Sequence, residues 1–265
     1  MPGIDREAAV EIQRRAFDDF VALLGSAAPG SRLVDLDGVR AAAVPAAPER
    51  SIVNSVTYRD PEALAANLEL LASIEAEAGV RAWTVWATEE DGRAIEVLEA
   101  AGHAFDGRPA AMVLELDDFA PPELGDLDWD AGASYELLGR LNDEAYGPMN
   151  GGGIAAALAR EPTAAPLPRL YQARLDGEPA SVLATIDHAP GPGAAGPDCG
   201  VYWVATPERF RRRGLATRLL GAVLAEARER GCATSSLQAS SMGAPVYESL
   251  GYRPHFRFAM YERRA

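Results

Sequence analysis

The sequence contains no lysine, so all 25 basic residues are arginine, and it has only two cysteines and three histidines. Cys199 and Cys232 stand alone and far apart, which predicts two reduced thiols and excludes a CxxC zinc site. His103 and His255 show no spacing typical of metal ligands. The composition therefore predicts a protein without a metal centre.

Long hydrophobic runs are also missing. No stretch approaches the roughly 18 uninterrupted apolar residues that a membrane helix needs. The N-terminal sequence MPGIDREAAVEIQRR is charged early and lacks the apolar core of a signal peptide. We therefore expect a cytoplasmic protein that does not bind membranes.

Positive charge is scarce, and the net charge of −14 is unevenly distributed. Residues 1–125 contain 10 arginines against 23 acidic residues, a net of −13, whereas the remainder is nearly neutral. A nucleic-acid-binding protein needs a basic face, so this balance argues against a nucleic-acid partner. Such a surface is compatible with a cationic substrate, although acidic residues also simply keep proteins soluble.

The chain divides into two similar halves. The segment DDFAPPELGDLDWD, at 117–130, has two prolines and no apolar periodicity, which predicts a linker. On each side of it an amphipathic helix ends at a glycine, Gly79 or Gly231, and a strand follows. The same spacing pairs VLEAAGHAF in the first half with VYESLGYRP in the second. We interpret this pattern as two copies of one unit, with domains at 1–122 and 127–265.

The second copy predicts antiparallel strands before a long helix and a crossover to a parallel neighbour after it. The expected fold class is α/β, with a mixed, mostly antiparallel sheet flanked by helices in each domain. The predicted elements of the second domain are helices at 135–146, 154–160, 215–230 and 243–250 and strands at 170–175, 181–187, 200–205, 234–239 and 256–262. In the first domain the corresponding helix has the apolar stripe Leu64, Leu68, Leu71 and Ile74, and the strand after it is 83–87.

Three consecutive arginines, Arg211–Arg213, stand directly before the long helix of the second domain. The start of a helix is already partly positive, so cations there are unfavourable unless an anion lies between them. Free N–H groups at a helix start bind phosphate, and Gly214 lets the backbone approach closely. The stretch is therefore a candidate phosphate site, and a solvated basic turn is the alternative.

The spacing Arg211-x-x-Gly214-x-Ala216 resembles the pyrophosphate signature of the GNAT superfamily of N-acetyltransferases. The segment SSMGAPVYESLGYRP resembles a later motif of the same family, and the resemblance covers roughly 127–265. It implies acetyl-CoA, or a related acyl-CoA, as donor. It also implies a sheet that splays after VYWVAT, where residues 204–206 offer backbone groups to the pantetheine arm. The cofactor-binding residues that it implies are Val204, Ala205, Thr206, Arg211, Arg212, Arg213, Gly214, Leu215, Ala216, Thr217, Ser240 and Tyr247.

The chemistry needs a proton donor for the departing CoA thiolate, and a phenol placed beside the sulfur can supply it. By resemblance, Tyr247 is this acid. The incoming ammonium must also lose a proton, but the strand GVYWVAT carries no carboxylate in its middle. The general base therefore stays unassigned among Glu144, Asp187 and Asp198. Asp187 and His188 have no nucleophile beside them, which favours a surface turn over a catalytic dyad.

The first domain departs from the family motif. At the offset of the repeat, Asp60, Pro61 and Glu62 replace the arginine turn, and Leu98 replaces Tyr247. Acidic side chains repel a pyrophosphate and proline has no N–H to donate. Asp60 and Pro61 instead predict an ordinary helix start with Asp60 as N-cap. This domain is thus interpreted as a degenerate GNAT-like scaffold that packs against the active one.

The resemblance implies an enzyme that acetylates a small-molecule or peptide amine, with an acceptor pocket around residues 142–154. Another acyl donor and a non-catalytic acyl-CoA sensor are alternatives. A nucleic-acid module using RRRG is disfavoured by the acidic first half. The chain is expected to be a monomer, with its halves forming a pseudo-dimer, or a homodimer.

Overall fold

The computed structural model describes residues 3–147, 153–164 and 166–265, and the chain forms two compact units. Unit 1 comprises Met1–Ala16, Ala110–Gly147 and Pro166–His255. Unit 2 comprises Phe17–Pro109, Pro148–Ala165 and Phe256–Ala265. No helix in the described part of the chain has both the length and the apolar character needed to cross a membrane.

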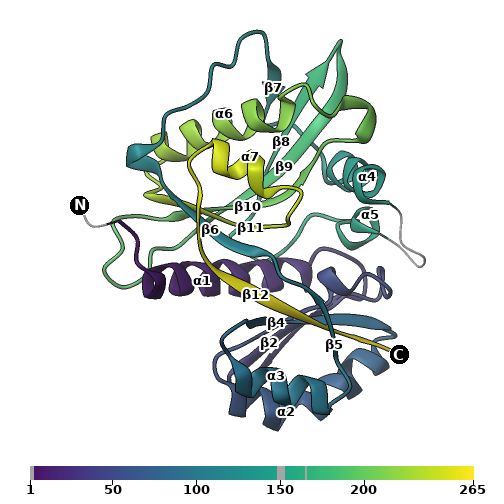
Figure 1. The fold of residues 1–265 in the computed structure, drawn as a ribbon. Helices are drawn as coiled ribbons and strands as arrows, with labels where there is room; N and C mark the ends of the chain where they lie inside the picture. Colours follow the sequence, from purple (N-terminus) through teal and green to yellow (C-terminus); the bar gives the residue numbers. More distant parts are fainter. Residues whose placement is uncertain (1–2, 148–152, 165) are drawn as a thin grey trace. The chain divides into compact units, whose positions relative to one another are not determined.

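Unit 1 contains a mixed sheet in the order β6-β11-β10-β9-β8-β7. Among the described strands of this sheet, only the β10–β11 pair is parallel, and the other neighbours are antiparallel. Helices α6 and α7 pack together, and α6 also contacts β8, β9 and β10 (Figure 1). The elements of the unit are β6 (Ala110–Glu115), η2 (Leu116–Asp118), β7 (Asp128–Asp130), α4 (Tyr135–Tyr146), β8 (Arg169–Leu175), β9 (Glu178–His188), β10 (Asp198–Ala205), η3 (Glu208–Phe210), α6 (Leu215–Glu229), β11 (Thr234–Ala239) and α7 (Ala244–Ser249).

Unit 2 contains a sheet in the order β1-β2-β3-β4-β12, and β5 also pairs with β12. Its one parallel pair in the described residues is β3–β4, joined through α2 just as β10 and β11 are joined through α6. Helices α2 and α3 lie side by side against this sheet (Figure 1). The elements are β1 (Arg32–Leu36), β2 (Val39–Ala43), η1 (Ser51–Val53), β3 (Ser55–Tyr58), α2 (Pro61–Glu77), β4 (Ala82–Thr88), α3 (Gly92–Ala100), β5 (Ala104–Gly107) and α5 (Ile154–Ala157).

The last strand of each sequence half pairs within the unit built mainly from the other half. Strand β6 pairs antiparallel with β11 in unit 1, from Thr234↔Glu115 to Ala239↔Ala110. Strand β12 (Arg253–Arg264) pairs antiparallel with β4 in unit 2, from Phe258↔Thr88 to Arg264↔Ala82. The compact units therefore differ from a division of the chain at residues 122–127, because the strands that complete each sheet come from the other side of that division.

The sequence repeat is present in the local structure. Helix α2 begins at Pro61, and the Asp60 carboxylate accepts the Ala63 N–H at 2.9 Å, which confirms the predicted cap. After the helices, Gly79 and Gly231 adopt left-handed φ values of 79° and 91°, which residues with a Cβ rarely adopt. The crossover from β10 to a parallel β11 is confirmed as well.

Each unit has its own apolar core. In unit 1 the stripe of α6 packs on the sheet through Leu219, Leu220, Val223, Leu224 and Ala227. In unit 2 the buried leucines of α2 pack with Val56, Val85 and Trp83. Trp83 and Trp86 on β4 are both buried. Leu98, at the position that corresponds to Tyr247, is fully buried in the core of unit 2.

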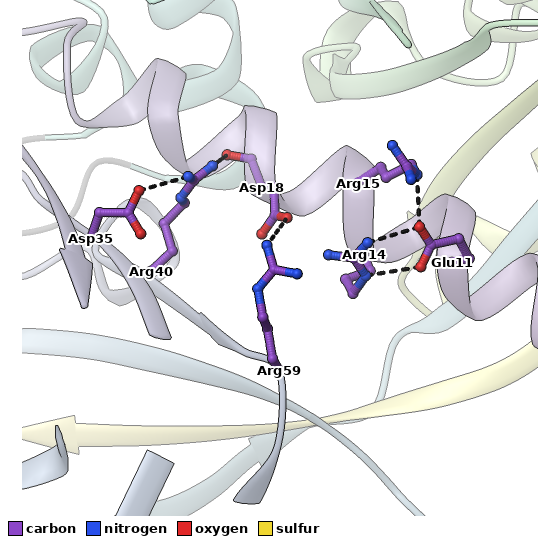
Figure 2. Close-up of polar contacts among 7 residues, drawn as sticks. All are labelled: Glu11, Arg14, Arg15, Asp18, Asp35, Arg40 and Arg59. Atoms are coloured by element: carbon purple, nitrogen blue, oxygen red, sulfur yellow. Dashed lines mark hydrogen bonds and ion pairs between the residues drawn. The ribbon is translucent and has the colours of Figure 1, made fainter. Parts of the chain in front are cut away.

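The N-terminal helix α1 (Arg6–Leu24) is not among the elements predicted from the sequence. Its start belongs to unit 1, where Gln13 donates to the Met112 and Leu237 carbonyls at 3.2 Å each. Arg14 and Arg15 both pair with Glu11 on this part of the helix (Figure 2), and the hydrogen bond from Arg14 lowers the pKa of Glu11.

The end of α1 belongs to unit 2. There Phe17 packs against Trp86 with ring centroids 4.6 Å apart. Arg40 donates to the Asp18 carbonyl and pairs with Asp35 at 2.7 Å (Figure 2). The helix thus supplies apolar side chains to this unit in addition to the polar contacts it makes in unit 1.

The predicted linker at 117–130 is held against α6 along much of its length. Arg228 donates to the Phe119 carbonyl at 2.9 Å, and Arg218 donates to the Leu124 carbonyl at 3.1 Å. The final three residues of the segment form strand β7, which pairs with β8. The segment without apolar periodicity is thus mostly irregular but packed against α6. Arginines of α6 donate hydrogen bonds to its carbonyls.

We expect Gly221→Ala to destabilise the protein, although alanine favours helices by about 1 kcal/mol over glycine. A Cβ at residue 221 would lie 2.4 Å from both Cγ and Cδ of Pro122. Overpacking of this kind costs about 1–3 kcal/mol. Urea unfolding of Gly221→Ala, Pro122→Ala and the double variant measures the effect. The double variant is expected to recover the lost stability, and an equal loss with and without Pro122 would contradict the packing explanation.

Candidate functional site

The sheet of unit 1 opens within strand β10. Its parallel pairing with β11 is limited to Asp198, Cys199 and Gly200, although both strands continue beyond these residues. On the other side, Tyr202 pairs with Ala184 and Ala205 with Val182, so two residues of β10 oppose one of β9. Trp203, within this bulge, has a φ of 51°, a left-handed value that is rare for a bulky residue. The opening predicted near residues 204–206 therefore begins earlier, after Gly200.

Helix α6 starts beside this opening with free backbone donors. Gly214 is its N-cap, with a φ of 70°, and within the described residues no side chain caps the helix. The first turn contains no acidic residue. The N–H groups of the first turn have no acceptor within the helix, which favours a bound anion. The corresponding start of α2 is capped by Asp60 and followed by Glu62, so it is much less favourable for binding an anion.

The three arginines before α6 have different positions. The Arg211 guanidinium donates to the Thr206 carbonyl at 2.9 Å and to the Ala145 carbonyl at 2.8 Å. Arg212 is exposed and has a left-handed φ of 62°. Arg213 is exposed as well. Arg211 therefore fixes the backbone around the opening, whereas the other two keep their charge near the helix start.

Tyr247 lies on the short helix α7 and faces the same space. Its ring packs edge-on against Tyr252, with centroids 6.0 Å apart. The Tyr252 hydroxyl is 2.7 Å from Ser235 Oγ, which donates to the Cys199 carbonyl, so the supporting ring is fixed. Burial raises the pKa of Tyr247 well above its usual range, and the nearby Tyr146 adds to this effect. The phenol therefore stays protonated and able to donate a proton.

These features meet in a cavity of about 390 Å³, a size typical of small-molecule sites. Nine of the twelve residues implied by the family resemblance line it, namely Val204, Thr206, Arg211, Arg212, Gly214, Leu215, Ala216, Thr217 and Tyr247. Ala205 is buried, Arg213 is exposed outside the lining, and Ser240 precedes α7, where its hydroxyl accepts the Gly243 N–H at 3.2 Å. The cofactor-binding set implied by the resemblance omits five lining residues, namely Tyr146, Phe210, Met242, Gly243 and Val246.

Signals for some of the missed residues exist in the sequence. Phe210 directly precedes the arginine turn, and Met242, Gly243 and Val246 fall within the segment that carries Tyr247. Tyr146 falls within the segment 142–154 that is expected to form the acceptor pocket, but its contact with Val204, 58 residues away along the chain, has no signal in the sequence. The Val204 carbonyl accepts the Tyr146 hydroxyl at 2.7 Å. Only the packing of α4 beside β10 brings these two residues together.

The three carboxylates considered for the general base lie outside the cavity lining. Asp187 forms two hydrogen bonds with Arg230, each 2.8 Å long, which lower its pKa against the effect of burial. Asp198 is buried and accepts hydrogen bonds from Thr234 and Ser236, although burial raises its pKa. Glu144 forms an ion pair with Arg209. Each carboxylate is thus engaged with the protein itself.

Asp187 and His188 do not form the surface turn that the sequence favours. They end strand β9, and His188 is fully buried. Its Nε2 lies 2.9 Å from the Tyr202 hydroxyl, which donates to the Ala16 carbonyl. A Cβ on Gly200 would lie 2.4 Å from this nitrogen, so the glycine makes room for the pair. The buried network explains why a polar pair stands at the end of an apolar strand.

Within residues 3–147, 153–164 and 166–265, no group of three or more His, Cys, Asp or Glu side chains could hold a metal ion.

Of the predicted acceptor segment, residues 148–152, including Asn150 to Gly152, lie outside the described residues. The helix after it is shorter than predicted and lies in unit 2, where the Arg160 N–H donates to the Ala27 carbonyl.

Comparison with known families agrees with this geometry. Residues 142–252 match the model of the acetyltransferase (GNAT) family. The matched residues all lie in the second half of the chain. The match includes the opening of β10, the start of α6 and Tyr247. No curated protein sequence matches the chain.

Solved structures share the fold over most of the chain. A GCN5-related N-acetyltransferase from Kribbella flavida has a TM-score of 0.68 at 20% identity, covering 100% of this chain and 97% of that one. A tandem GNAT protein from the clavulanic acid biosynthesis pathway has a TM-score of 0.56 at 14% identity, covering 98% and 97%. A GCN5-related N-acetyltransferase from Sphaerobacter thermophilus has a TM-score of 0.53 at 18% identity, covering 87% and 82%. At these identities the likeness concerns the fold alone.

Proposed function

We propose that the GNAT domain transfers an acetyl group from acetyl-CoA to the amine of a small molecule or peptide. The observation that carries this proposal is the single cavity that joins the uncapped start of α6 to the phenol of Tyr247. The anion-binding end of the cavity suits the nucleotide diphosphate of such a cosubstrate. The proton donor at the other end suits its acyl thioester.

The cavity residues fit this ligand. Its polar end has the N–H groups of Gly214, Leu215 and Ala216 together with the Arg212 charge, which suits a pyrophosphate. The rest of the wall is largely apolar and includes Val204, Met242 and Val246, which suits the arm of the cosubstrate. The acetyl thioester is then expected at the opening of β10, near Tyr247.

The roles of the chain's own residues follow from this placement. The amine nitrogen attacks the thioester carbonyl carbon, and the C–S bond breaks as the carbonyl re-forms. Tyr247 donates its proton to the departing sulfur, and a proton from the attacking nitrogen passes to solvent or to a base. General acid catalysis of this kind contributes about 10²- to 10⁴-fold to a rate.

A calorimetric titration with coenzyme A, followed by a turnover screen of acetyl-CoA against a panel of amines, tests the proposal. We expect binding of coenzyme A and release of free thiol with at least one amine. Binding without turnover against any amine would favour the alternative of an acyl-CoA sensor. Absence of binding would reject both functions.

A further inference from the structure

The C-terminal half of α4 is joined to the bulge of β10 by side-chain hydrogen bonds. Asn142 donates from Nδ2 to the Trp203 carbonyl at 3.1 Å and to the Leu138 carbonyl at 2.9 Å. Tyr146 donates from its hydroxyl to the Val204 carbonyl at 2.7 Å. Trp203 and Val204 both follow the point at which β10 separates from β11. Side chains of α4 thus bind carbonyls in this open part of the strand.

Arg211 completes the connection. It joins the Thr206 carbonyl, at 2.9 Å, to the Ala145 carbonyl, at 2.8 Å. Ala145 lies in the last turn of α4, where carbonyls lack a partner within the helix. The carbonyls of residues 203, 204 and 206 therefore all accept hydrogen bonds from side chains of this protein.

The three donors differ in how easily a ligand could replace them. Asn142 is 2% exposed and does not line the cavity, so its hydrogen bonds support the fold. Arg211 lines the cavity but divides its guanidinium between two carbonyls. Tyr146 is 50% exposed, lines the cavity, and makes one hydrogen bond to Val204, which also lines it. The Tyr146 hydroxyl is thus the donor that a ligand in the cavity can displace.

We propose that Tyr146 is a positioning residue that holds the Val204 carbonyl in the free protein and releases it to an amide N–H of the arriving acyl-CoA. This inference rests on the proposed function, because it requires a ligand with an amide-bearing arm in the cavity. One hydrogen bond to the Val204 carbonyl is exchanged for another. The protein must break its own contact first, so the native tyrosine weakens donor binding. In Tyr146→Phe the Val204 carbonyl is hydrogen-bonded only to water before the ligand binds.

Titration of Tyr146→Phe with coenzyme A and with adenosine 3′,5′-bisphosphate tests the inference. The bisphosphate has the nucleotide end but lacks the amide arm, so its Kd is expected to be the same for both proteins. The Kd for coenzyme A is expected to fall about three- to tenfold in the variant, the worth of one hydrogen bond. In turnover the KM for acetyl-CoA falls and kcat stays unchanged. Tyr135→Phe, at the start of the same helix and outside the cavity, is the matched control and should behave as wild type.

Each other outcome has a separate meaning. Equal or weaker binding of coenzyme A by Tyr146→Phe, with the bisphosphate unaffected, overturns the role of Tyr146 and leaves the proposed function standing. If wild type binds neither ligand, the proposed function fails and this inference fails with it. If kcat drops in Tyr146→Phe at unchanged KM, the phenol acts in the chemistry and its role as a displaceable donor is overturned.

Discussion

Replacing Tyr247 with phenylalanine is expected to lower kcat by about 10²- to 10⁴-fold and to leave the Kd for coenzyme A within about twofold. The change removes only the hydroxyl, so the ring still packs against Tyr252. The raised pKa of Tyr247 keeps the phenol protonated, so the wild-type kcat should show no loss from its ionisation below about pH 10. Steady-state kinetics with the best amine, together with calorimetry, measures both quantities.

Tyr252→Phe provides the matched control. It removes a neighbouring phenol that is buried and hydrogen-bonded to Ser235 rather than facing the cavity. This variant should lose about 1 kcal/mol of stability and retain kcat, which is the opposite of the result expected for Tyr247→Phe. A Tyr247→Phe enzyme with wild-type kcat would show that the thiolate leaves without this acid.

Replacing Glu75 with methionine is expected to stabilise the protein by up to about 5 kcal/mol at pH 8–9, because each tenfold change in proton affinity corresponds to about 1.4 kcal/mol. Glu75 is on the buried face of α2, 1% exposed, and neither of its carboxylate oxygens has a hydrogen-bond partner among the described residues. Burial raises its pKa from 4.5 to about 8, with Arg32 acting weakly in the other direction. Ionising this group inside the core is therefore unfavourable.

The sign of the pH dependence follows from the raised pKa. The folded state binds the proton more tightly than the unfolded state, so the contribution of Glu75 to stability is fully present below about pH 4.5. It is lost as the pH rises through about 8. Urea unfolding of wild type and Glu75→Met at pH 5, 7 and 9 should show a difference that grows with pH. Glu77→Gln, exposed on the same helix, is the surface control. A constant difference would contradict a protonated Glu75.

The contrast between the two helix starts explains why we place the ligand in only one unit. Helix α6 begins with Gly214, free N–H groups and arginines. Helix α2 begins with a capped start at Asp60, a proline without an N–H and Glu62 in the first turn. The same supersecondary unit therefore has opposite electrostatics at the two sites. We propose that unit 2 serves as scaffold.

Much of the local structure could be predicted from the sequence. Helix α4 and strand β11 have the predicted bounds, and Asp60 caps α2 as its side-chain chemistry requires. The arginine turn and Tyr247 could also be named in advance, since each belongs to a short contiguous motif. These features depend on residues near one another in the chain, where periodicity, caps and turn residues act directly.

Other features depend on contacts between distant residues. Strand β6 is apolar and buried over nearly its whole length, so its pattern suits either sheet and does not determine which partner it pairs with. The partner of β12 is likewise determined only by the folded structure. The buried His188 network and the docking of the proline-rich segment on α6 likewise depend on atoms far apart in sequence.

The sequence by itself determined the helix–glycine–strand repeat, the unequal charge of its two halves and the motif residues at the start of α6 and on α7. Only the tertiary structure decided which sheet each final strand completes and that Tyr146 donates a hydrogen bond to the Val204 carbonyl. The physical reason is that local conformation follows from neighbouring side chains, whereas strand pairing and cavity walls follow from the packing of the whole unit.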